Sequence, residues 1–141
     1  MRQRNVPWLS NRQVKFDQPI NLVDVVPTLL DLMTGGVPAG LDGASRVGAL
    51  REPSSWRAEN VVIEWHDDAD RAIDGRSLRT ADNWKLNLYR GDTPELYDLN
   101  ADPGELRNLA GEAGQRERIG LMAAEIRAWQ TRHKDTLPLQ A

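Results

Sequence analysis

The sequence contains no cysteine, and this absence excludes several kinds of site at once. A chain without thiols forms no disulfide, offers no thiolate to a metal ion and has no cysteine nucleophile. Long hydrophobic runs are also missing, because no apolar stretch approaches the ~20 residues that cross a bilayer. Residues 1–9 carry charge but no apolar stretch of signal-peptide length. We therefore expect no membrane partner and no signal peptide in this sequence, and localisation stays open.

Charge of a single sign is missing too. The 18 basic and 21 acidic residues are well mixed, the net charge is −3, and no basic stripe is present. A nucleic-acid partner is therefore not expected. What is present is ordinary globular composition, with 40% hydrophobic and 28% charged residues.

The first part of the chain is predicted to be too small to form a core of its own. Loose alternation over Gln18–Val23 indicates a short strand, and Asp24 follows as a helix N-cap. The helix then ends at Gly35 and leads into a surface connection over residues 37–55. Its apolar residues recur at i, i+3, i+4 and i+7, which is typical of one helical face: Val26, Leu29, Leu30 and Met33. A strand and one helix cannot bury their own apolar faces, so this part should pack on something larger.

The second part alternates with the period of β-strands and closes with a helical pattern. Strands are predicted over residues 60–66, 76–80, 84–90 and 95–99, and the short turns between them favour antiparallel pairing. A long helix is predicted over residues 113–133, with residues 135–141 as a tail. The expected fold class is α+β, a small antiparallel sheet of about four strands packed against a long C-terminal helix. Three tryptophans are predicted to anchor the core between sheet and helix: Trp65, Trp84 and Trp129.

Four ordered segments carry a resemblance to a known family. Residues 95–105 read ELYDLNADPGE and residues 108–110 read NLA, which resembles the closing signature of sulfatases. Residues 24–32, DVVPTLLDL, and residues 40–45, GLDGAS, are similar to the late helix of that family and the segment after it. Arg79 followed by Trp84-Lys85-Leu86 resembles a strand pair of the family, with Trp84 where tyrosine is usual. The resemblance covers most of the chain.

This resemblance implies a division of the chain and a parent activity. Residues 1–55 would be the trailing piece of a sulfatase catalytic domain with its connecting loop, and residues 56–141 the C-terminal subdomain. The strand-helix piece would belong to a large α/β domain that is missing here. The sheet that follows it would support the catalytic domain and line the rim of the substrate pocket. The expected partners are the missing N-terminal sulfatase domain and a sulfated small molecule or sugar.

Catalytic chemistry in the family depends on parts that this sequence does not match. Sulfatases use a formylglycine made from the first residue of a Cys/Ser-x-Pro-x-Arg motif, together with a divalent cation, usually calcium. Residues 51–57 look superficially similar, but Arg51 stands at the nucleophile position, two before Pro53. We therefore expect no catalytic residue, no metal ligand and no cofactor in this chain. Calcium and formylglycine are expected in the full-length parent.

Candidate binding residues follow the first predicted strand. In the family the loop there often approaches the pocket rim, which makes His66, Asp67 and Arg71 candidate rim residues. The acidic run from Glu64 to Asp70 does not have the spacing of an EF-hand, and a solvated acidic loop is the simpler interpretation. Arg79 and Lys85 on neighbouring strands could meet a sulfate or carboxylate, or could pair with acidic neighbours.

Two alternatives to the sulfatase hypothesis stay open. The chain could be a stand-alone, non-enzymatic interaction module derived from a sulfatase. It could also be part of a phosphonate or phosphate monoester hydrolase of the same superfamily, although the ELYDL and NLA segments favour a sulfatase.

Overall fold

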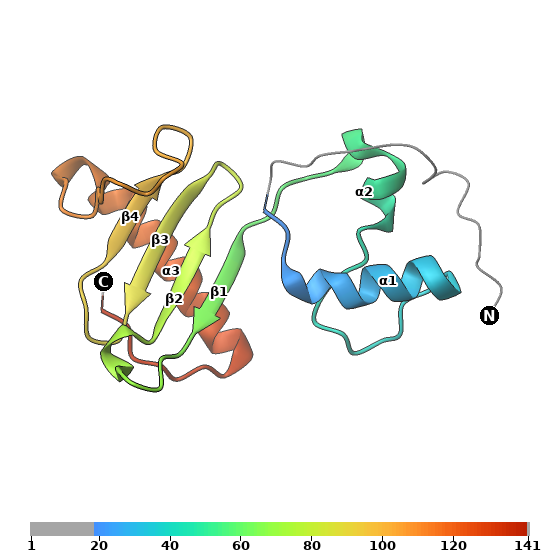
Figure 1. Cartoon of the computed structure of the whole chain (residues 1–141), viewed down its shortest axis with the longest axis horizontal. Coiled ribbons are helices and arrows are strands. Elements are labelled where there is room, and N and C mark those ends of the chain that lie inside the picture. The colour runs from blue at the N-terminus through green and yellow to red at the C-terminus, as the bar shows by residue number, and fades with distance from the viewer. Residues whose placement is uncertain (1–18, 141) are drawn as a thin grey trace. The chain divides into compact units, whose positions relative to one another are not determined.

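A computed structural model describes residues 19–140, and the chain divides into two units, residues 1–59 and 60–141. The described part of the first unit holds the short 3-10 helix η1 (Leu22–Asp24), α1 (Val25–Thr34), α2 (Val47–Arg51) and η2 (Pro53–Ser55) (Figure 1). The strand predicted over Gln18–Val23 is wrong for residues 19–23, since η1 begins at Leu22, and Gln18 lies outside the described residues. Local capping decided this, because the Asn21 side chain accepts a hydrogen bond from the Val23 N–H and turns the chain there.

Helix α1 has the predicted C-terminal stop, because Gly35 adopts the left-handed conformation at φ 79° and its N–H bonds to the Asp31 carbonyl. Asp24 stands at the N-cap position, but its side chain does not cap the helix. Its buried carboxylate instead accepts bonds from the Ala44 N–H at 2.9 Å and the Arg46 Nε at 2.8 Å. The prediction therefore gave Asp24 its correct position at the N-cap, but the capping hydrogen bond is absent.

The polar side of α1 is used inside the first unit. The Thr28 hydroxyl accepts the Arg46 N–H at 2.9 Å, and the Asp31 carboxylate accepts the Ser45 hydroxyl at 2.6 Å. These contacts hold residues 44–46 against the helix. Gly43 is required next to them, because a Cβ there would collide with the Val23 carbonyl. The segment over residues 37–55 is thus more than the predicted surface connection, since it contains the residues bonded to α1 and also forms α2.

The second unit is the predicted antiparallel sheet with its closing helix. The strands β1 (Val61–Trp65), β2 (Gly75–Arg79), β3 (Trp84–Tyr89) and β4 (Glu95–Asp98) lie side by side in sequence order (Figure 1). Every neighbouring pair is antiparallel. The short 3-10 helix η4 (Ala113–Gln115) leads into α3 (Arg116–His133), which packs on β2 and β3. The predicted α+β fold class is confirmed.

The core lies between one face of the sheet and α3. It consists of residues that alternation along the strands and helical spacing both place there: Leu78, Leu86, Leu88, Leu96, Met122, Ala123 and Ile126. Trp84 packs against this cluster as predicted, but Trp65 and Trp129 do not belong to it. Trp65 meets Tyr89 edge to face, with ring centroids 5.5 Å apart, and Trp129 lies against His133 at 4.7 Å. Strand alternation explains why Trp65 is outside the core, because its side chain points to the sheet face that does not carry Leu78.

The predicted tail is part of the fold. Asp135 pairs with the buried Arg76 through two contacts of 2.9 and 3.0 Å, and the Gln140 N–H bonds to the Tyr89 carbonyl. Leu139 also packs against the core. Within residues 19–140, no helix has the length and apolar content that crossing a membrane requires.

Candidate functional site

The loop that joins β1 to β2 is shaped by its own carboxylates. The Asp67 side chain accepts the N–H groups of Ala69 and Asp70 at 2.7 and 2.8 Å. The Asp70 side chain accepts the Ala72 N–H at 2.9 Å and so caps the short 3-10 helix η3 (Arg71–Ile73). Carboxylates that accept local backbone N–H groups stabilise turns. These two side chains are therefore committed to holding the loop in shape.

A buried aspartate, Asp74, brings the three predicted rim residues together. Its side chain is 0% exposed and accepts the Asp67 backbone N–H at 2.9 Å. Its second oxygen lies 2.8 Å from the Arg71 Nε and 3.7 Å from the His66 Nδ1. His66 and Arg71 thus stand over one shared carboxylate, while their own side chains remain 49% and 54% exposed.

Asp74 is held as an anion. The hydrogen bond from the Asp67 N–H lowers the pKa of the Asp74 carboxyl, and burial opposes this effect. The charge of Arg71, and that of His66 when it is protonated, lower the pKa further. The carboxylate therefore stays ionised and keeps a cation in front of it.

The loop is fixed to the sheet at several points. The Trp65 indole N–H donates to the Ile73 carbonyl at 2.7 Å, and the Arg90 N–H donates to the Asp74 carbonyl at 2.8 Å. Gly75 allows the Trp65 ring to lie against the backbone, because a Cβ at that position would overlap the ring. The loop can therefore present an imidazole and a guanidinium in a defined arrangement, as binding of an anionic or hydroxyl-rich ligand requires.

Sequence reasoning missed Asp74. An aspartate that follows an apolar residue at the start of a strand carries no spacing signal of its own. The sequence showed only that several acidic residues precede β2. Their number did not indicate that Asp74 is buried while the others are not.

The cationic pair on the neighbouring strands is not part of this loop. Arg79 and Lys85 lie on neighbouring strands, as predicted, and are direct cross-strand partners, but they lie at the end of β2 that is far from Gly75. Lys85 pairs with Glu105 at 2.7 Å, which fits the interpretation of acidic neighbours. Arg79 instead donates to the Asn83 side-chain oxygen at 3.1 Å, which is an amide oxygen and not a carboxylate.

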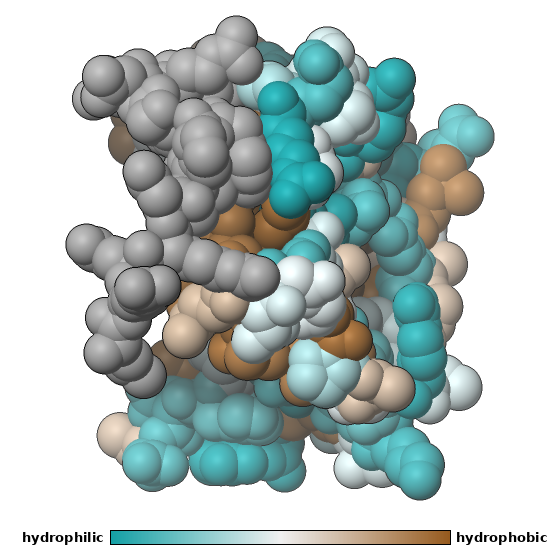
Figure 2. All heavy atoms as spheres, turned by 90° about the vertical axis from the view of Figure 1, so that its right-hand side faces the viewer, coloured by the Kyte–Doolittle hydropathy of each residue, from teal (hydrophilic) through white to brown (hydrophobic). Residues whose placement is uncertain are grey.

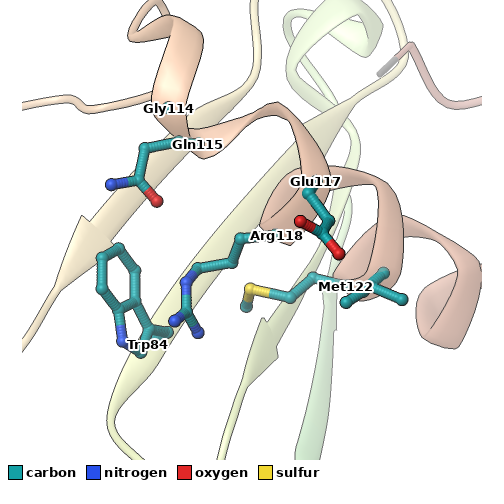
Figure 3. A pocket seen from close by; sticks show the side chains of 7 residues that line it. Trp84, Gly114, Gln115, Glu117, Arg118 and Met122 are labelled. Carbon is teal, nitrogen blue, oxygen red and sulfur yellow. The ribbon is translucent and has the colours of Figure 1, made fainter.

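A hollow of about 460 Å³ lies beside the start of α3, and no sequence pattern indicated it. In Figure 3 the Arg118 side chain extends between Trp84 and Met122, with Gln115 and Glu117 at the border. The Arg118 guanidinium stacks on the Trp84 ring at 4.0 Å and also lies 3.5 Å from the Asp82 carboxylate. Since Arg118 already covers one face of the indole, that face is closed to a stacking sugar ring.

Within the described residues, no group of three histidine, aspartate or glutamate side chains lies close enough to hold a metal ion. Two carboxylates of the acidic run before β2, those of Asp67 and Asp70, thus form turns beside Asp74.

Comparisons with known proteins agree with the resemblance read from the sequence. Residues 5–132 match the family model of the N-sulphoglucosamine sulphohydrolase C-terminal region. The Delta 4,5-hexuronate-2-O-sulfatase of Bacteroides thetaiotaomicron is 31% identical over 115 residues, which cover 80% of this chain and 24% of that protein.

Two solved structures extend the comparison. One, a protein in complex with its substrate D-glucosamine-2-N,6-O-disulfate, is 28% identical with a TM-score of 0.67, covering 82% of this chain and 24% of that one. The phosphonate monoester hydrolase of Agrobacterium radiobacter is 30% identical with a TM-score of 0.58, covering 78% and 24%. The chain thus spans about a quarter of the length of these relatives. With its ordered motifs, four-stranded sheet and closing helix, the chain belongs to the sulfatase family and corresponds to the C-terminal domain of its members.

Proposed function

We propose that this chain is the C-terminal part of a sulfuric ester hydrolase that removes sulfate from a sugar. The observation that carries the proposal is the family match over residues 5–132 together with coverage of only a quarter of the relatives. One relative is a hexuronate sulfatase and another binds a glucosamine disulfate as its substrate. A sulfated sugar is therefore the substrate class that these comparisons favour.

The chemical step belongs to other polypeptide of the parent. No cysteine is present and Arg51 stands where the motif over residues 51–57 would need its nucleophile. When present in the parent, formylglycine supplies the group that attacks sulfur and calcium polarises the sulfate oxygens. This chain contributes support and binding, and it is inactive alone.

Helix α1 is the proposed contact with the catalytic domain. Its polar side is occupied by residues 44–46, whereas Val26, Leu29 and Met33 on its apolar side are between 52% and 65% exposed. Hydrophobic atoms, brown in Figure 2, come to the surface in the middle of one side of the molecule. Among residues 19–59, nine large apolar side chains are exposed: Ile20, Leu22, Val23, Val25, Val26, Leu29, Met33, Val37 and Leu41.

Such a concentration of apolar side chains is uncommon on a free surface and typical of an interaction site. Complete burial of one valine, leucine or methionine contributes about 1.5–3 kcal/mol. A catalytic domain that covers α1 would therefore gain several such contributions.

The loop around Asp74 is the proposed part of the substrate rim. Arg71 and His66 have exposed side chains that can contact a sulfate, a carboxylate or a sugar hydroxyl. Asp67 contributes to the rim indirectly, by shaping the loop. Its backbone N–H donates to Asp74, and its carboxylate already accepts two N–H groups of the turn.

The test is an assay of the purified 141-residue chain with an aryl sulfate and calcium. We expect no turnover above that of the buffer. Turnover that persists after repeated purification would show that the chain carries its own catalytic group, and the division of labour proposed here would be wrong.

A second candidate is a phosphonate monoester hydrolase, because one such enzyme shares 30% identity and the same fold. An assay of the parent enzyme distinguishes the two candidates, because its kcat/KM for an aryl sulfate can be compared with its kcat/KM for an aryl phosphonate. Higher kcat/KM for the phosphonate would favour the second candidate. A stand-alone module is distinguished by the DNA upstream of Met1, where an in-frame Cys-x-Pro-x-Arg would contradict it.

A further inference from the structure

A buried carboxylate oxygen in the loop between β1 and β2 lacks a hydrogen bond. The Asp74 Oδ1 accepts the Asp67 N–H, but no described residue donates a hydrogen bond to the Asp74 Oδ2, and the side chain is 0% exposed. The Arg71 Nε lies 2.8 Å from this oxygen as an ion pair that lacks the alignment of a hydrogen bond. Native proteins leave few buried polar atoms unpaired, so this oxygen requires an explanation.

The His66 imidazole is the group that can supply the missing donor. Its Nδ1 lies 3.7 Å from the Asp74 Oδ2, which is about 0.5–1 Å too long for a hydrogen bond. A neutral imidazole carries a single N–H, on either nitrogen, whereas an imidazolium has an N–H on both. Protonation of His66 therefore places a donor at Nδ1, and a side chain that is 49% exposed has room to close the gap.

The other charged groups around the loop are engaged elsewhere or exposed to water, which weakens their field. Two of them accept N–H groups of the turn, two lie 3.6 Å from each other across β1 and β2, and two are exposed: Asp67 and Asp70, Glu64 and Arg76, and Asp68 and Arg90, respectively. The carboxylate that faces the imidazole is thus Asp74, and the cation beside it is Arg71.

From this geometry we propose that His66 and Asp74 form a proton-dependent switch that releases Arg71 toward an anionic ligand in acid. The inference rests on the proposed function, in which this loop lines the substrate rim. While His66 is neutral, Arg71 is the cation that faces the Asp74 carboxylate, and the three side chains together carry no net charge. When His66 takes up a proton from water, its Nδ1–H forms the hydrogen bond to Oδ2. Arg71 then turns outward, and the three side chains carry one net positive charge.

The charged state of the switch suits a sulfate or a sugar carboxylate. A guanidinium that is released from Asp74 can present two parallel N–H donors to one anion. Imidazoles as a class change charge between about pH 5 and 8, so the switch operates on the acid side of neutrality. Binding is reciprocal, and an anion at Arg71 must strengthen proton binding by His66 by the same factor.

An exposed histidine that titrates without contacting Asp74 is the ordinary alternative. It would add the same positive charge to the loop and would leave Arg71 in place against the carboxylate. The two cases therefore differ in the state of Arg71, and an experiment must observe this side chain directly.

The first experiment follows the Arg71 Nε–H of the 141-residue chain by NMR relaxation at about pH 8 and about pH 5.5. Its order parameter should fall in acid to below about 0.6, the range of a flexible group. The Arg76 Nε–H is the control in the same spectra, because its partner Asp135, 2.9 Å away, has a lowered pKa and stays ionised at both pH values. His66→Phe has a ring without an N–H and should keep Arg71 ordered throughout. Equal order of Arg71 at both pH values in the unchanged chain would overturn the proposal.

The second experiment titrates inorganic sulfate into the same samples and follows the amide signals of residues 66–73, which separates this site from His133 at the end of α3. The unchanged chain should bind sulfate about 2- to 5-fold more tightly in acid, as one added surface charge allows. His66→Phe should bind it equally at both pH values. Tighter binding in acid while Arg71 stays ordered would assign the effect to an ordinary exposed imidazolium and refute the switch alone. Release of Arg71 without sulfate binding at either pH would refute the rim role of the loop and this inference with it.

Discussion

Replacement of Asp135 by alanine should destabilise the second unit more than replacement of any exposed aspartate. Arg76 is 2% exposed, and Asp135 meets it with both oxygens, at 2.9 and 3.0 Å. The same carboxylate also accepts the Gln130 side-chain N–H at 2.9 Å and the Leu137 N–H at 3.1 Å. Its loss would leave the guanidinium buried without its main anion.

The magnitude follows from this geometry. Removal of one partner of a buried ion pair costs about 3–5 kcal/mol. A unit of about 80 residues has a free energy of unfolding of about 4–12 kcal/mol. The variant should therefore lose a large share of its stability, and its Tm should fall by more than about 10 °C.

Urea unfolding followed by circular dichroism measures the effect, with Asp68→Ala on the exposed loop as the matched control. The double variant Arg76→Met with Asp135→Leu should recover most of the loss, because replacing both partners with apolar side chains is often neutral. A change below about 0.5 kcal/mol for Asp135→Ala, as at ordinary surface sites, would refute the reasoning.

The same pair predicts a pH dependence. Burial alone raises the pKa of the Asp135 carboxyl, but hydrogen bonds from Arg76, Gln130 and the Leu137 N–H together hold it below the usual 3.8. A carboxyl with a lower pKa in the folded state contributes stability above its unfolded pKa and loses it as the pH falls through the folded value. Acid unfolding should therefore begin below about pH 4, and Asp135→Asn should reduce that slope. An unchanged slope in the variant would contradict this assignment.

Three further predictions concern the core, α1 and the rim loop. Ile126→Ala should cost about 2–5 kcal/mol in urea unfolding, while Leu121→Ala, at a side chain that is 68% exposed, should cost less than about 0.5 kcal/mol. The chain alone should self-associate through α1, and Leu29→Asp should shift its light-scattering mass toward the monomer; a monodisperse unchanged chain would contradict this. Asp74→Asn should speed amide exchange at Asp67, since the Asp67 N–H donates to the Asp74 carboxylate and an uncharged amide oxygen accepts this bond less strongly; unchanged exchange would show that Asp74 does not fix the loop.

Sequence patterns sufficed for the second unit because its elements obey local rules. Leu86 and Leu88 alternate with Lys85 and Asn87 along one strand, and a period of two places them on opposite faces whatever the partner is. Helical spacing likewise selected Met122 and Ile126 for the core. The same reasoning failed over residues 19–23, where hydrogen bonding by Asn21 outweighed a weak alternation.

The sequence by itself determined the family, the α+β class, the strand order and the side of α3 that enters the core, since these depend on short-range periodicity and on ordered motifs. Only the tertiary structure decided the partners of the buried charges. Asp74 lies against His66 and Arg71, Asp135 pairs with Arg76 across 59 positions, and Asp24 binds Ala44 and Arg46. The physical reason is that a buried charge is stabilised by whichever opposite charge or N–H the fold brings near, and this proximity leaves no periodic trace in the chain.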